Sequence, residues 1–102
     1  MYQKIWYIII VDDKKKYRVL LSKKVQKNLR KVPQKIRDKF ALLAVQLSES
    51  GPVANNWQNY SKLSGTQYHC HLSLHWVACW SYEKGQIIIE VYYVGSRENA
   101  PY

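Results

Sequence analysis

The chain of 102 residues has few cysteines and no long hydrophobic run. Its two cysteines, Cys70 and Cys79, form no CxxC pair, which argues against a cysteine-based metal site or a disulfide framework and favours a reduced, cytoplasmic protein. The apolar segment at residues 5–11 is too short to span a bilayer. Asp12 and Asp13 follow it directly, and the segment lacks the small residues of a signal-peptide cleavage site. We therefore expect neither a membrane span nor a signal peptide. We interpret this segment as an extra edge strand.

Acidic residues are also scarce, because 16 Lys+Arg stand against 7 Asp+Glu and give a formal net charge of +9. Twelve of the sixteen basic residues lie between Lys14 and Lys39, where Asp38 is the only acid. Such a run can be a solvated helix face, but with this net charge it favours a nucleic acid or an acidic protein partner. The residues that we expect to contact a nucleic acid are Lys23, Lys27, Arg30, Lys31 and Lys62.

Two helices are predicted in the first half of the chain. Ser22 can cap a helix in which Val25, Leu29 and Val32 recur at helical spacing. Proline is favoured in a first helical turn, so a second helix is expected to begin near Pro33. The apolar stripe of this second helix consists of Ile36, Phe40, Leu43 and Leu47.

Strands precede and follow the helices. We predict them at residues 17–21, 68–72, 76–82 and 87–94. A turn at Gly85 joins the last two, because glycine supplies the positive φ of a tight hairpin, whereas residues 53–67 have no clear period and indicate a loop. This order predicts an α+β domain over residues 17–102, with two antiparallel helices packed on one face of a small antiparallel sheet that ends in a three-stranded meander. Residues 1–16 form an N-terminal extension.

A histidine pair marks the candidate site. His69 and His71 alternate with Tyr68, Cys70 and Leu72, and alternate side chains of a strand share a face. The two imidazoles therefore point to one side, and the other three side chains point toward a core. Histidine exchanges protons near neutral pH, which suits acid–base catalysis. The alternative is a pair of ordinary solvated or hydrogen-bonded surface residues.

A zinc site is a second alternative for the histidine pair. Catalytic zinc takes three protein ligands, so His75 or Cys79 would have to join His69 and His71. No CxxC or HExxH motif accompanies them. We therefore expect no metal and no other cofactor, and we interpret His75, near a tight turn, as structural.

Several further features follow one another in this short chain. They are the strand–helix–helix start, Lys62-Leu63-Ser64-Gly65 before an aromatic strand, the run Trp76-Val77-Ala78-Cys79-Trp80, and Val94-Gly95-Ser96-Arg97 with a final Tyr102. In this order and spacing, residues 17–102 resemble the RelE/ParE toxin superfamily of toxin–antitoxin systems. The likeness is to the RelE-like branch.

For that branch the resemblance implies a messenger-RNA endoribonuclease that acts at the ribosome, inhibits translation and is held inactive by a cognate antitoxin. His69 and His71 match its two catalytic strand lysines. Arg97 matches its arginine after the last strand, and Tyr102 matches its C-terminal tyrosine. The implied roles are proton transfer by the histidines, phosphate binding by Arg97 and orientation of the nucleotide by Tyr102.

One departure from the family pattern keeps other functions open. Val77 stands where the family often carries an arginine, so a phosphate contact is missing or is supplied by Lys62 or another residue. A ParE-like inhibitor of DNA gyrase, which acts by protein binding, and an inactive toxin remnant are the alternatives. The histidine pair favours the nuclease, because a toxin that only binds has no need of two ionisable residues beside Arg97.

Overall fold

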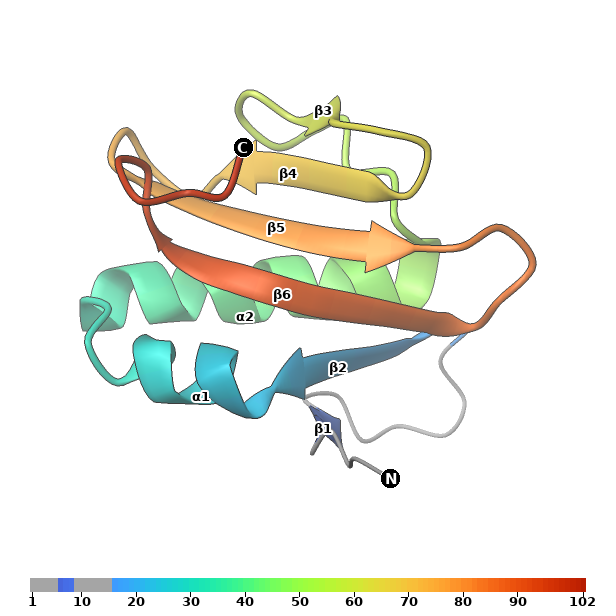
Figure 1. The fold of residues 1–102 in the computed structure, drawn as a ribbon, viewed down its shortest axis with the longest axis horizontal. Helices are drawn as coiled ribbons and strands as arrows, with labels where there is room; N and C mark the ends of the chain where they lie inside the picture. Colours follow the sequence, from blue (N-terminus) through green and yellow to red (C-terminus); the bar gives the residue numbers. More distant parts are fainter. Residues whose placement is uncertain (1–5, 9–15) are drawn as a thin grey trace.

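The computed structural model describes residues 6–8 and 16–102 (Figure 1). In chain order the elements are β1 (Trp6–Ile8), β2 (Arg18–Ser22), α1 (Lys23–Leu29), α2 (Gln34–Ser50), β3 (Ser61–Lys62), β4 (Gln67–His71), β5 (Trp76–Tyr82) and β6 (Ile88–Ser96). β1 belongs to the strand predicted at residues 5–11, and the rest of that segment lies outside the described residues. No helix in the described part of the chain is long and apolar enough to cross a membrane.

The strands form one sheet in the order β1-β2-β6-β5-β4-β3. The α+β class is confirmed, and β4, β5 and β6 form the predicted antiparallel meander. However, β2 pairs with β6 in parallel, so the prediction of an antiparallel sheet is wrong and the sheet is mixed. The alternation of side chains reveals that a segment is a strand, but it does not reveal which strands pair or in which direction.

Local sequence explains where the helices begin and end. The Ser22 hydroxyl caps α1 by accepting the N–H of Val25 at 3.2 Å. α1 ends before Val32, which was expected to be helical but instead lies buried in the turn between the helices. α2 begins after Pro33 and ends at Gly51, whose φ of 94° favours glycine.

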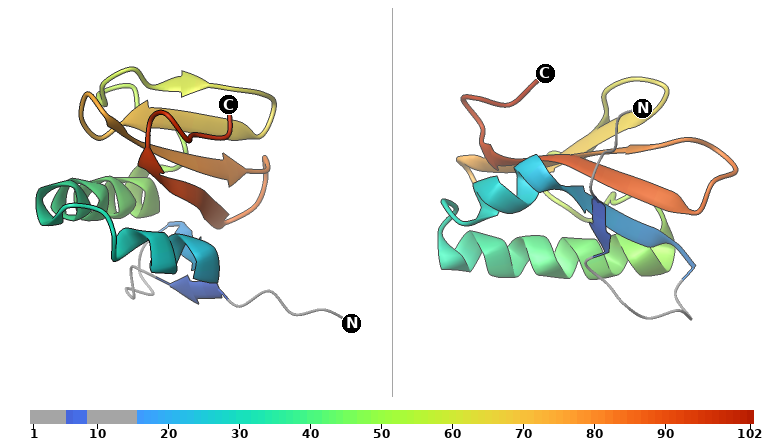
Figure 2. Two further views of the ribbon diagram at one scale, coloured as in Figure 1. Left: turned by 60° about the vertical axis from the view of Figure 1, so that its left-hand side comes forward. Right: turned by 60° about the horizontal axis from the view of Figure 1, so that its bottom comes forward.

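Both helices share one core with a single face of the sheet, and Figure 2 shows α2 running along that side. The helices and the turn between them contribute Val25, Val32, Ile36, Phe40, Leu43, Ala44 and Leu47, and the sheet contributes Val19, Leu21, Tyr68, Cys70, Ala78, Trp80, Ile89, Val91 and Val94. Trp80 is fully buried, and its indole N–H donates to the Pro52 carbonyl at 3.0 Å. We call the side of the sheet that packs against the helices the helix face, and we call the opposite side the histidine face.

A β-bulge in β6 changes which side chains reach the histidine face. Cys79 pairs with Tyr93 and Trp80 pairs with Val91, so Tyr92 is an extra residue without a cross-strand partner. The hydroxyl of Tyr92 forms a hydrogen bond with the Cys79 thiol, which lies on the histidine face. Two consecutive tyrosines, Tyr92 and Tyr93, therefore lie on that one face.

Candidate functional site

His69 and His71 lie side by side on the histidine face, opposite Cys79 and Val77 of β5. Their ring centroids are 5.7 Å apart. Each residue is only 7% exposed, so the pair is far more buried than a solvated surface pair. The strand geometry that the sequence indicates therefore brings the two imidazoles together in a sheltered position.

The C-terminal segment covers the pair. After β6 the chain turns back, and the Arg97 N–H donates to the His75 carbonyl at 2.8 Å. The end of the chain then lies beside β4 (Figure 1). The ring of Tyr102 lies 4.5 Å from the ring of His69, centroid to centroid, at an angle of 54°. Arg97 and Tyr102, which are distant from β4 in sequence, are thus brought to the histidines.

Burial and neighbouring charge set the protonation of the pair. Burial lowers the pKa of His71, and the positive charge of Arg97 lowers it further. Burial and the charge of His71 lower the pKa of His69, while a hydrogen bond to the Ser61 backbone opposes this shift. Both imidazoles are therefore neutral at pH 7. Burial raises the pKa of Tyr102, so its phenol keeps its proton.

Asn59, in the loop before β3, and Ser61, the first residue of β3, hold the histidine rings in place. The Ser61 Oγ lies 3.0 Å from Nδ1 of His69, and the Asn59 Nδ2 lies 3.2 Å from Nδ1 of His71. Both contacts use Nδ1, which leaves Nε2 of each ring for a ligand. Neither Asn59 nor Ser61 could be identified from the sequence, because residues 53–67 have no period and reach β4 only through tertiary contacts.

The floor of the site is apolar at the position where the family often has an arginine. Val77 is fully buried between His71 of β4 and Gly95 of β6. A Cβ atom at Gly95 would lie 2.8 Å from the hydroxyl oxygen of Tyr93, so a side chain there would displace the Tyr93 ring. Burial raises the pKa of the Cys79 thiol to about 12, which makes it unsuitable as a nucleophile.

The predicted cations divide into those near the site and those away from it. The Lys62 ammonium lies 5.6 Å above the Tyr68 ring, and Tyr68 belongs to the helix face. Lys62 therefore does not replace the missing arginine beside the histidines. Lys31 lines a hollow of about 260 Å³ together with Tyr93 and Asn99, which connects the end of α1 to the C-terminal turn.

The remaining basic residues form a separate surface on α1. Lys23, Lys27 and Arg30 line a hollow of about 420 Å³. Its walls belong to α1 and the turn after it, and they include neither histidine. Lys31 does not line this hollow and belongs instead to the smaller one beside Tyr93 and Asn99.

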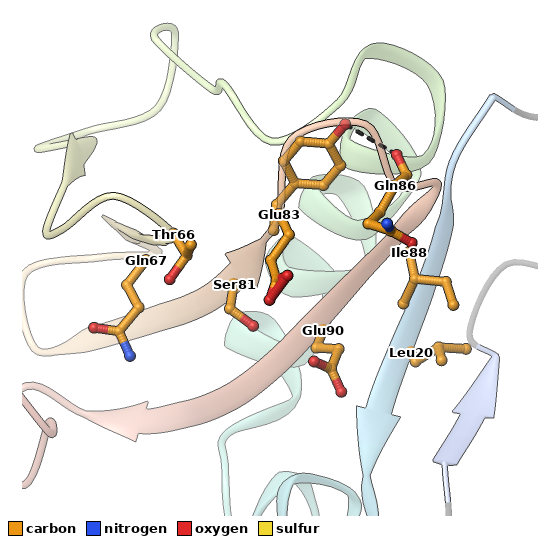
Figure 3. Close-up of a pocket in the computed structure, with 9 residues that line it drawn as sticks. Leu20, Thr66, Gln67, Ser81, Glu83, Gln86, Ile88 and Glu90 are labelled. Carbon is orange, nitrogen blue, oxygen red and sulfur yellow. Dashed lines mark hydrogen bonds between the residues drawn. The ribbon is translucent and has the colours of Figure 1, made fainter.

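A larger hollow, of about 590 Å³, lies at the other end of the histidine face (Figure 3). Ser81, Glu83 and Glu90 extend into it, and its wall contains none of the predicted site residues. Two carboxylates make this hollow a poor place for a phosphate. Size alone therefore does not identify the candidate site.

The zinc alternative can also be examined in the geometry. Among residues 6–8 and 16–102, no group of three or more His, Cys, Asp and Glu side chains is arranged to hold a metal ion. Neither His75 nor Cys79 thus completes a ligand set with the histidine pair. The site is a pair of imidazoles, a guanidinium and a phenol.

Comparisons with protein-family models and with curated proteins give no match. Among solved structures, the fold is similar to that of a chain in the crystal structure of the archaeal RelE–RelB complex from Pyrococcus horikoshii OT3. The TM-score is 0.67 and the sequence identity is 19%, over 83% of this chain and 99% of that chain. The chain therefore has a RelE-like fold, which confirms the resemblance seen in its sequence.

Proposed function

We propose that this protein is the toxin of a toxin–antitoxin system and that it cleaves messenger RNA in the cytoplasm, at the ribosome, without a metal ion. The observation that carries this proposal is the histidine pair, with rings 5.7 Å apart, the Tyr102 ring 4.5 Å from the ring of His69, and the positive charge of Arg97 near His71. Four side chains able to act on a phosphodiester converge from two distant parts of the sequence.

The chemistry needs a base for the 2′-hydroxyl proton, a cation for the charge that develops on phosphorus, and a proton for the leaving 5′-oxygen. A positioned histidine contributes about 10²–10⁴-fold to such a step. Arg97 can bind the phosphate with two parallel hydrogen bonds, and Tyr102 can orient a base by stacking. Both imidazoles are neutral at pH 7, so a proton acceptor is available when RNA binds.

An acidic antitoxin segment is the partner that we propose for the basic surface on α1. The similar chain of known structure was crystallised as a RelE–RelB complex. The net charge of +9 favours an acidic ligand over a basic one. Co-expression with the product of the adjacent gene should rescue growth and yield a complex on purification. If that product neither co-purifies nor rescues growth, the partner proposal is wrong.

A ParE-like inhibitor of DNA gyrase is the second candidate. It is favoured by one observation, the buried Val77 beside His71, which leaves the site without a second cation. A protein that acts only by binding gyrase needs no phosphate contact there. The two functions differ in which macromolecule is damaged when the chain is expressed alone.

The test is inducible expression of the chain without a partner, followed by mapping of messenger-RNA 5′ ends. We expect growth arrest and new 5′ ends from the natural sequence and from His75→Gln, which changes an exposed histidine and serves as the control. His69→Gln, His71→Gln and Arg97→Ala should lose both effects. Growth arrest by all three variants, without new 5′ ends, would replace the nuclease with the gyrase-type function.

A further inference from the structure

The loop beside β4 contains an unusual backbone conformation. Asn59 has a φ of 53° and is the only non-glycine residue with positive φ in the described part of the chain. Asparagine tolerates this left-handed conformation better than most residues, and such positions are often retained at functional sites. The loop is also tied to the strand, because the His71 N–H donates to the Gln58 carbonyl at 2.8 Å.

In the contact made by Asn59, only one of the two partners can be the hydrogen-bond donor. Its Nδ2 lies 3.2 Å from Nδ1 of His71, and an amide nitrogen can only donate hydrogen bonds. Nδ1 must then be the acceptor, so it carries no proton. A neutral imidazole with an unprotonated Nδ1 has its single proton on Nε2. His71 therefore presents an N–H, and no lone pair, at the nitrogen left for a ligand.

His69 has a different kind of partner. The Ser61 hydroxyl at 3.0 Å from its Nδ1 can either donate or accept. Burial and the charge of His71 lower the pKa of His69, and a hydrogen bond to the Ser61 backbone favours the protonated ring and partly offsets this lowering. His69 can therefore hold a proton on Nδ1 and offer a lone pair at Nε2, and it can become charged. The two histidines are unlike in what they can do.

The surroundings of His71 reinforce the difference. The charged and titratable groups near it are His69 on the same strand, Arg97 after β6, and Lys39 of α2, which lines the same hollow of about 300 Å³. The residues that line this hollow include no carboxylate. Nothing in this lining stabilises a positive charge on His71.

We propose that Asn59 is a positioning residue that holds His71 as the neutral Nε2–H tautomer, so that His71 donates a hydrogen bond to the scissile phosphate while His69 alone transfers protons. This rests on the proposed ribonuclease function. His69 takes the 2′-hydroxyl proton as the O2′–P bond forms. It returns this proton to O5′ as the P–O5′ bond breaks. His71 keeps its proton throughout, as the neutral electrophilic histidine of triosephosphate isomerase does.

The tautomer can be measured without RNA, by ¹⁵N NMR of the histidine rings in the full chain. We expect His71 to show an unprotonated Nδ1 and a protonated Nε2 at neutral pH. Asn59→Asp keeps the size and the left-handed tolerance of the residue but replaces the donor with an acceptor. It should therefore move the proton to Nδ1 and raise the pKa of His71. Asn55→Asp makes the same charge change in the same loop and should leave the His71 signals unchanged.

Cleavage kinetics supply the second measurement. The natural chain should show a rate that rises with pH through one ionisation, that of His69, and then levels off. Asn59→Asp should add a falling limb, because its His71 has a proton on Nε2 only when charged. Its rate above that limb should be about 10- to 100-fold lower, the range found when a metal-bound histidine loses its orienting partner.

The two measurements separate the possible failures. A protonated Nδ1 on His71 in the natural chain would show that the Asn59 amide presents its oxygen, and the inference would be wrong whether or not RNA is cleaved. An unchanged tautomer in Asn59→Asp would also overturn it. The expected tautomer together with an absence of RNA cleavage would instead overturn the proposed function.

Discussion

His69 and His71 on the histidine face are buried almost as fully as the core residues of the helix face, but for a different reason. On the helix face, Trp80 stacks with Tyr68 and Tyr60 and belongs to the core shared with α2. Its indole N–H is hydrogen-bonded. On the histidine face, His69 and His71 are covered by the C-terminal segment and by the loop before β3. Burial by helices stabilises the fold, whereas burial by a terminal segment and a loop shifts pKa values and fixes hydrogen bonds.

The largest effect should come from the histidine face. Replacing His69 with Gln removes the proton acceptor and should lower the RNA-cleavage rate by about 10²–10⁴-fold. The free energy of unfolding should change far less, because glutamine can keep a hydrogen bond near Ser61. Urea unfolding and a cleavage assay on the same preparation measure both quantities. A variant that cleaves normally would remove His69 from the mechanism.

On the helix face, a substitution should change the free energy of unfolding more than it changes the cleavage rate. Trp80→Ala empties the centre of the core and should lower the free energy of unfolding by about 3–5 kcal/mol. The adjacent Cys79→Ala, equally buried but on the histidine face, removes one atom and should cost on the order of 1 kcal/mol. Denaturant unfolding of the two variants tests the comparison directly. Equal losses would show that the two faces contribute alike to stability.

The buried histidines should also make stability depend on pH. Their pKa values in the folded chain lie below the ordinary 6.5, so just below pH 6.5 the unfolded chain binds more protons than the folded one. Their contribution to the free energy of unfolding is therefore complete above pH 6.5. It falls as the pH drops toward the folded-state pKa, by at most about 1.4 kcal/mol per pH unit for each histidine.

A double variant, His69→Gln with His71→Gln, provides the control for this dependence. It should lose most of the slope in the range just below pH 6.5, as measured by denaturant unfolding at several pH values. An unchanged slope would assign the dependence to other groups.

The last effect concerns the Tyr102 ring that lies against His69. Tyr102→Ala uncovers His69, so the pKa of His69 should rise toward its ordinary value, and RNA binding should weaken by about 1–3 kcal/mol if a base stacks there. Tyr102→Phe keeps the ring and should leave the pKa of His69 lowered. NMR titration of His69 distinguishes the two variants. Identical titrations would mean that the ring does not shelter this histidine.

Much of the helix face could be predicted from the sequence. The bounds of β5, Trp76–Tyr82, agree with the prediction, because a glycine turn and apolar alternation are local signals. The shared face of His69 and His71 also follows from strand geometry alone. The parallel pairing of β2 with β6 could not be predicted, because it joins the first and last strands of the domain and depends on the path of everything between them.

The contacts that complete the histidine face were harder to predict. Asn59 lies in a loop without periodicity, and its left-handed backbone and contact with His71 exist only in the folded chain. The direction of Lys62 depends on the register of β3 with β4, and a shift of one residue would reverse it. The predicted roles of His69, His71, Arg97 and Tyr102 remain predictions, although the fold brings these residues together.

The bulge at Tyr92 shifts the alternation of side chains between the two faces of β6. Ile89 and Val91 face the helices on one side of it, and Val94 does so on the other, although the spacing from Val91 to Val94 is odd. The unpaired Tyr92 absorbs this odd spacing, so the residues before and after the bulge keep the same relation to the two faces of the sheet. Deleting Tyr92 would make the spacing even, and a regular strand would still place Val91 and Val94 on the helix face while losing the contact between Tyr92 and Cys79. The bulge thus gives the histidine face one more side chain without changing how the strand leads to Arg97.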